Sequence, residues 1–149
     1  MRAVVQRVNR ARVQVDGRVT GQIEGGLCVF LGVGPDDGEK EISWMAEKIL
    51  NLRIFEDGEG RMNRSLKDEG GAMLVVSQFT LYGDCRKGRR PSFIGACEPE
   101  KAERIYERFI QVSSSLGVHV ESGVFQAFMQ VELCNDGPVT LIIDTAGGC

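Results

Sequence analysis

The feature that most constrains the fold is an apolar run that ends abruptly in polar side chains. Residues 72–76 are apolar and follow a pair of glycines, and Ser77, Gln78 and Thr80 come directly after them. A short apolar run bounded by glycine is typical of a buried strand. Because buried hydroxyl and amide groups need hydrogen-bond partners, we expect the strand to leave the core here and present these groups from a rigid support. The alternative is a strand end whose hydroxyls cap the following turn.

Apolar residues alternate with polar ones in several other segments, which predicts a chain rich in strands. Residues 27–33 are apolar nearly throughout and indicate a central strand buried on both faces. Asp16-Gly17 predicts a two-residue hairpin turn. Residues 135–138, which read Asn-Asp-Gly-Pro, predict a tight hairpin connection between the last two strands. The expected strands cover residues 2–8, 12–16, 18–24, 27–33, 72–76, 118–121, 129–133 and 139–144.

Two segments carry apolar residues at helical spacing. The first covers residues 39–52, where Trp44 and Leu50 widen the apolar stripe and are expected in the core. The second covers residues 99–116 and begins with a proline, which suits the first helical position. Glu98 is not a favoured N-cap, so we expect the second helix to fray at its start.

The predicted fold class is therefore α+β, with about eight short strands in a barrel-like or packed antiparallel arrangement and two helices. A chain of 149 residues suits a single domain, which we expect to span residues 1–145. Residues 146–149 are expected to form a disordered tail.

Composition and cysteine spacing argue against several classes of protein. The sequence has no apolar run of about 18 residues and no apolar segment behind its basic N-terminus, so neither a membrane span nor a signal peptide is expected. The five cysteines are widely spaced and form no Cys-x-x-Cys pair, which argues against a zinc site or a disulfide framework. We therefore expect a cytoplasmic protein without a metal or other cofactor.

The chain lacks the side chains of a conventional nucleophilic site. His119 is its only histidine, and it falls on a predicted strand far in sequence from Ser77 and Thr80. A Ser-His-Asp triad would have to use it, and a surface histidine is the simpler interpretation. Without a base, neither hydroxyl is activated as a nucleophile. If the protein is an enzyme, we expect it to act by positioning its substrate and through backbone dipoles.

Three further groups of residues have both a functional and a structural interpretation. Gly137-Pro138 lies between two patterned strands, and because proline has no N–H the pair is either a plain turn, trans by default, or a device that presents backbone carbonyls. Phe125 and Met129 are four residues apart, and they either hold a base and ribose or belong to the core. One loop is crowded with basic residues and forms either a phosphate-contacting or a merely solvated surface: Arg86, Lys87, Arg89 and Arg90.

Several short motifs lie in order over almost the whole chain: QRV at 6–8, RIFxDxxGxMN at 53–63, SQFTL at 77–81, RPSF at 90–93 and MQVxLxNDGPVT at 129–140. The two main ones, SQFTL and NDGPVT, are highly specific when they occur together. This set of motifs resembles that of the D-aminoacyl-tRNA deacylase family.

The resemblance implies a homodimer that hydrolyses the ester linking a D-amino acid to the 3′ end of tRNA, a proofreading step in translation. It implies that Gly137-Pro138 is cis, braced by Arg7, and inserted into the partner subunit's pocket. The two carbonyls would grip the α-amino group of the substrate and exclude an L side chain. Glycyl-tRNA would also pass as a substrate. The implied contacts are Ser77, Gln78, Phe79 and Thr80 around the ester and Phe125 and Met129 around the terminal adenosine.

Within this resemblance, we expect backbone N–H groups around Phe79 and Thr80 to stabilise the oxyanion while water attacks, aided by the ribose 2′-OH. Thr80 as a covalent nucleophile is a second possibility. Two other functions fit the same residues. One is a non-catalytic RNA-binding β-domain that uses the basic loop, and the other is a general hydrolase of small esters.

Overall fold

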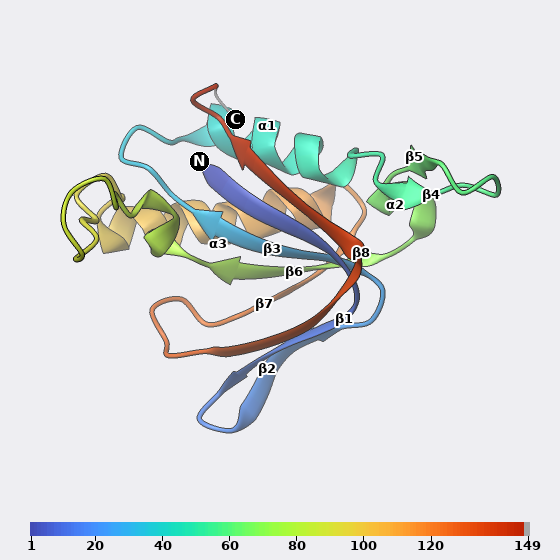
Figure 1. The fold of residues 1–149 in the computed structure, drawn as a ribbon, viewed down its shortest axis with the longest axis horizontal. Coiled ribbons are helices and arrows are strands. Elements are labelled where there is room, and N and C mark those ends of the chain that lie inside the picture. The colour runs from blue at the N-terminus through green and yellow to red at the C-terminus, as the bar shows by residue number, and fades with distance from the viewer. Residues whose placement is uncertain (148–149) are drawn as a thin grey trace.

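The computed structural model describes residues 1–147 and places two long helices against one face of a curved sheet (Figure 1). The strands are β1 (Arg2–Val15), β2 (Arg18–Ile23), β3 (Gly26–Gly32), β4 (Phe55–Glu56), β5 (Met62–Arg64), β6 (Ala72–Ser77), β7 (His119–Ser122) and β8 (Gln130–Asp144). The helices are α1 (Glu39–Leu50), α2 (Leu66–Glu69), the 3₁₀ helix η1 (Phe79–Tyr82) and α3 (Pro99–Ser115).

Strand β1 organises the sheet because it pairs along both of its edges. It pairs antiparallel with β3 and β2 in succession, and antiparallel with β8 along nearly its full length. Strand β6 extends the sheet beside β3, and β7 lies beside β6, both in parallel. The predicted hairpin turn between β1 and β2 is confirmed, and Asp16 and Gly17 both adopt the positive φ angles that it needs.

The sheet curls until β2 approaches β7, which gives a nearly closed, barrel-like structure (Figure 1). The approach is close because Gly21 has no side chain. A Cβ at this position would lie 2.5 Å from the carbonyl oxygen of Ser122. The strand-rich α+β class expected from the sequence is therefore confirmed.

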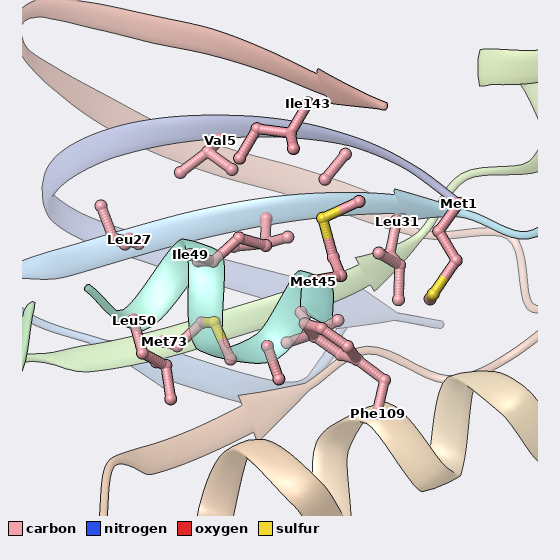
Figure 2. Close-up of a cluster of buried hydrophobic side chains, with 14 of the residues drawn as sticks. Met1, Val5, Leu27, Leu31, Met45, Ile49, Leu50, Met73, Phe109 and Ile143 are labelled. Atoms are coloured by element: carbon pink, nitrogen blue, oxygen red, sulfur yellow. The ribbon is translucent and has the colours of Figure 1, made fainter. Parts of the chain in front are cut away.

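Curling creates two layers of core, one on each face of β3 and β6. The layer beneath α1 and α3 contains Leu27, Leu31 and Met73 from the strands, packed against Met45 and Phe109 from the helices (Figure 2). The layer inside the barrel is built from smaller side chains of four strands, β1, β2, β3 and β6: Val8, Ala11, Val13, Ile23, Cys28, Leu74 and Val76. Strand β3 is thus buried on both faces, as its apolar sequence predicted.

Strand β8 shows that the predicted hairpin at residues 135–138 is wrong. Residues on both sides of this segment belong to one long strand that pairs with β1, and a step of two residues along β1 here corresponds to five along β8. Residues 136–138 therefore bulge out of the strand. The side chain of Asn135 closes the bulge, because its Oδ1 accepts the Val139 N–H at 2.8 Å and its Nδ2 donates to Thr140 Oγ1 at 3.0 Å.

The two predicted helices are present, with small corrections. Helix α1 ends at Leu50 and α3 at Ser115, one or two residues earlier than expected. Trp44 was expected in the core but is 45% exposed, because it lies on the face of α1 opposite its buried stripe. The expected fraying at Glu98 is also wrong. Its carboxylate accepts the backbone N–H groups of Glu100 and Lys101 and caps α3.

The C-terminal segment stays close to the end of β8 as far as it is described. The backbone N–H groups of Ala146 and Gly147 both donate to Asp144. The rest of the predicted tail, residues 148–149, lies outside the described residues. None of the helices within residues 1–147 has the length and hydrophobicity needed to cross a bilayer.

Candidate functional site

A cavity of about 720 Å³ opens where β6 ends, beside η1 and the first turn of α3. Ser77, Gln78 and Phe79 line one part of it, and Phe125 and Met129, from the segment between β7 and β8, line another. These are residues that the sequence singled out in two separate motifs. The fold therefore brings a polar strand end together with an apolar wall.

The polar side of the cavity is held in place by the way the chain leaves the sheet. The backbone N–H of Gln78 donates to the carbonyl of Leu31 at 2.8 Å, and the Gln78 side-chain amide donates to the Thr80 hydroxyl. The first N–H groups of a helix have no intrahelical acceptor. In the described part of the chain, those of Phe79 and Thr80 also find no acceptor elsewhere. Two free backbone donors therefore lie next to the cavity.

The apolar wall is supported from α3. The ring of Phe125 packs on Tyr106 with 5.7 Å between ring centroids, and the Tyr106 hydroxyl donates to the carbonyl of Val75 at 2.8 Å. Burial raises the pKa of Tyr106, so this phenol remains a neutral donor. On the other side, Phe79 packs edge-to-face on Phe93, at 5.2 Å. Aromatic contacts therefore fix the position of both walls.

Arg7 holds the bulge of β8 through backbone carbonyls. Its Nη1 donates to the carbonyl oxygen of Ile54 at 2.6 Å and its Nε to that of Asp136 at 2.9 Å, while its side chain is almost wholly buried. The peptide bond of Gly137-Pro138, next along the chain, is cis. This agrees with what the resemblance implied and corrects the trans bond expected from the residues alone. The pair is exposed and does not line the cavity of its own chain.

The remaining candidates do not line the cavity. The four basic residues of the loop are exposed, but Arg86 is already paired with Asp84, whose carboxylate accepts its Nη2 at 2.7 Å. This hydrogen bond keeps the pKa of Asp84 far below its usual value. His119 is exposed on β7 and contacts Glu121, so it is not a base for Ser77 or Thr80. Within residues 1–147, no cluster of His, Cys, Asp and Glu side chains could hold a metal ion.

Some residues that line the cavity were not singled out from the sequence. Cys97, Ala102 and Gln126 all contribute to its wall. Ala102 belongs to the predicted second helix, so its pattern indicated only the core side of α3. Cys97 and Gln126 lie in loops and carried no periodic signal.

Comparison with known proteins identifies the family of this chain. A family model described as D-Tyr-tRNA(Tyr) deacylase matches residues 4–144. A D-aminoacyl-tRNA deacylase of Desulfotalea psychrophila is 61% identical over 145 residues, which cover 97% of both chains. A protein of the same name from Fervidobacterium nodosum is 59% identical over the same share of both chains.

Solved structures share the fold. One, named c-Myc DNA Unwinding Element Binding Protein, is 42% identical and superimposes with a TM-score of 0.93 over 97% of this chain and 99% of that one. Another, described as a probable eukaryotic D-amino acid tRNA deacylase, has a TM-score of 0.82 over 95% and 97% of the two chains. Its identity of 18% supports the fold alone. Because the family model and the relatives cover nearly the whole sequence, this chain belongs to the D-Tyr-tRNA(Tyr) deacylase family.

Proposed function

We propose that this protein hydrolyses the ester bond of D-aminoacyl-tRNA to give free amino acid and tRNA, a proofreading step in translation. Family membership supports this activity, because relatives 59–61% identical over nearly the full chain are D-aminoacyl-tRNA deacylases. The single observation that carries the proposal is the cavity, which joins the polar groups of Ser77 and Gln78 to the apolar wall of Phe125 and Met129. An ester attached to a nucleoside needs both surfaces.

The proposed reaction depends on positioning. Water attacks the ester carbonyl carbon, the bond from that carbon to the ribose 3′ oxygen breaks, and this oxygen takes up a proton. The neighbouring 2′-OH assists the water. The free N–H groups of Phe79 and Thr80 stabilise the negative charge on the carbonyl oxygen. Because an aminoacyl ester is already an activated acyl group, the absence of a nearby side-chain base among the described residues is compatible with this reaction.

We assign chiral selection to a homodimer in which Gly137-Pro138 of each subunit enters the cavity of its partner. The pair is exposed, is fixed through Arg7, and lies outside the cavity of its own chain, as a part that acts in another subunit would be. Its carbonyls bind the α-amino group and leave space for hydrogen or a D side chain. Glycyl-tRNA is therefore expected to be a second substrate.

We further propose that the basic loop contacts the phosphates of the tRNA. Lys87, Arg89 and Arg90 contribute most, because the charge of Arg86 is already matched by Asp84. A single domain of residues 1–145 carries the site, and the reaction takes place in the cytoplasm, where tRNA is charged and used.

One assay tests the function. Labelled D-tyrosyl-tRNA, L-tyrosyl-tRNA and a free amino-acid ester are incubated with the protein, and loss of label is followed with time. We expect rapid loss from the D-tyrosyl-tRNA alone. Salt-sensitive binding of tRNA without hydrolysis would indicate an RNA-binding domain instead. Turnover of the free ester at a similar rate would indicate a general esterase, and equal loss from both tRNA esters would refute chiral selection.

A further inference from the structure

One residue of the cavity wall has a backbone conformation that its side chain does not favour. Gln126 has a φ angle of 61°, in the left-handed region where residues other than glycine are uncommon. Asp16 is the other such residue among residues 1–147, and it occupies a hairpin turn that requires positive φ. Gln126 is the third residue of a four-residue turn that the Ala127 N–H closes by donating to the Val124 carbonyl at 3.2 Å, and a positive φ at this position favours glycine or asparagine over glutamine.

The turn accounts for the backbone conformation of Gln126 but makes no use of its side chain. The side-chain amide of Gln126 makes no hydrogen bond to any of residues 1–147, and the residue is exposed at the cavity. The amide is therefore a free donor and acceptor, and Gln126 lines the same cavity as Phe125 and Met129.

We propose that the Gln126 amide binds the base edge of the 3′-terminal adenosine of the tRNA. This proposal rests on the proposed function, in which Phe125 and Met129 hold that nucleoside. An unpaired base is recognised by a face that stacks and by an edge that forms hydrogen bonds. Glutamine matches adenine because its carbonyl accepts from the exocyclic amine while its NH₂ donates to a ring nitrogen. Gln126 thus supplies the edge contact that the apolar wall cannot supply.

The test compares Gln126→Gly with Asp16→Gly. Both substitutions place glycine where φ is positive, so both are expected to raise the thermal unfolding temperature slightly or leave it unchanged. Asp16→Gly, in the distant β1–β2 turn, is expected to leave the kinetics of D-tyrosyl-tRNA hydrolysis unchanged. Gln126→Gly is expected to raise KM at least about fivefold with little change in kcat, because a bidentate amide–adenine contact has roughly that effect or more.

A second readout identifies the contact itself. The tRNA is prepared with purine riboside, which lacks the exocyclic amine, in place of its terminal adenosine. The wild-type protein should show a raised KM with this substrate, whereas Gln126→Gly should not distinguish it from normal tRNA. Titration of the trinucleotides CCA and CC-purine riboside gives the same comparison by binding alone.

The possible failures are distinguishable. If the wild type hydrolyses D-tyrosyl-tRNA but Gln126→Gly has an unchanged KM, or discriminates against purine riboside as strongly as the wild type, the role of Gln126 is refuted and the proposed function stands. If the wild type hydrolyses none of the esters, the proposed function is refuted. Binding of both trinucleotides with equal affinity by the wild type would refute the role of Gln126 independently of any activity.

Discussion

At the scale of single residues, the contacts of Thr80 argue against a role as covalent nucleophile. Its hydroxyl accepts a hydrogen bond from the Gln78 amide, and His119, the only histidine, is paired with Glu121 on β7. We expect Thr80→Ala to lower kcat by less than about tenfold, because the Gln78 side chain loses its hydrogen bond to the hydroxyl. Thr80→Ser keeps the hydroxyl and should have nearly the wild-type kcat. Loss of a true nucleophile costs on the order of 10⁴–10⁶. Single-turnover deacylation measures the difference, and a loss of that size in a folded Thr80→Ala variant would restore the covalent mechanism.

Gly137 offers a direct test of the bulge. Its φ is 133°, and a Cβ there would lie 3.0 Å from Val139 Cγ2 and 3.1 Å from Arg7 Nη2. We expect Gly137→Ala to shift the guanidinium that fixes the bulge and to lower kcat/KM for D-aminoacyl-tRNA by about 10²-fold, the effect of a displacement near 1 Å. Gly17→Ala is the matched control, because Gly17 also has positive φ but a Cβ there meets nothing within 4 Å.

The control should lose about 1 kcal/mol of stability and no activity. Both variants are compared by chemical denaturation and by steady-state kinetics. Unchanged kcat/KM in Gly137→Ala would show that the bulge has no part in catalysis.

The sequence singled out five of the thirteen residues that line the cavity, and Gln126 was not among them. Ser77 and Gln78 were found because polar groups that end an apolar run need an explanation. Phe79 was found through the family resemblance, and Phe125 and Met129 through their spacing and the same resemblance. Two features distinguish Gln126 from a solvated loop residue, its positive φ angle and its place in the cavity wall. That angle depends on how the chain between β7 and β8 closes, so residue type alone carries no sign of it.

At the scale of elements, strand β8 shows why local patterns misled the prediction. Asn-Asp-Gly-Pro is typical of a hairpin turn, and the flanking alternation suits two short strands. In the structure both flanks pair with the same long strand, β1, and the side chain of Asn135 bridges the bulge between them. Whether such a segment reverses the chain depends on partners more than 100 residues away in sequence, as the pair of Gln6 with Thr140 shows.

The hairpin of β4 and β5 follows directly after Ile54, whose carbonyl oxygen accepts a hydrogen bond from Arg7. A change in this hairpin should therefore affect how Arg7 holds the bulge of β8. Asn63 joins its parts, because it accepts from Arg53 Nη2 at 2.8 Å and donates to Asp57 Oδ2 at 2.6 Å. We expect Asn63→Ala to loosen the hairpin and the Ile54 carbonyl that Arg7 contacts. The ratio of kcat/KM for D-tyrosyl-tRNA to that for L-tyrosyl-tRNA should then fall several-fold, with about 1 kcal/mol of stability lost.

The matched control is Asn51→Ala, which removes an exposed asparagine hydrogen bond to the Glu47 carbonyl at the end of α1. It should cost similar stability and leave the D-to-L ratio unchanged. An equal ratio in the Asn63→Ala variant and the wild type would show that the hairpin does not position the bulge.

At the scale of the whole molecule, the cavity combines residues from both faces of the sheet, one covered by helices and the other facing the barrel interior. Helix α3 covers one face and contributes Ala102 to the cavity, while Val76 and Met129 come from the barrel side. The apolar run of β3 predicted burial on both faces, and that of β6 predicted a buried strand. They did not predict that β2 would curl to meet β7, because that contact depends on the twist of the whole sheet and on the small size of Gly21.

Hydrogen-bonded carboxylates make the stability of the whole molecule depend on pH. Hydrogen bonds from Asn63 and from the N–H groups of Arg61 and Glu59 lower the pKa of Asp57, and bonds from Ser65 lower that of Asp68. A carboxyl whose pKa is lower in the folded state binds more protons when unfolded. Its contribution to stability is therefore complete above the unfolded pKa of about 3.9 and is lost as the pH falls through the folded value.

We therefore expect the thermal unfolding temperature to be nearly constant from about pH 7 to pH 5 and to fall steeply below about pH 4. Asp57→Asn should be less stable near neutral pH and should lose less stability on acidification, because one of the protonation steps is removed. Asp36→Asn serves as control, since Asp36 is exposed and its carboxylate accepts no hydrogen bond from residues 1–147. Scanning fluorimetry at constant ionic strength measures all three proteins. If Asp57→Asn and Asp36→Asn follow the wild-type pH profile equally, the hydrogen bonds to Asp57 do not contribute to acid sensitivity.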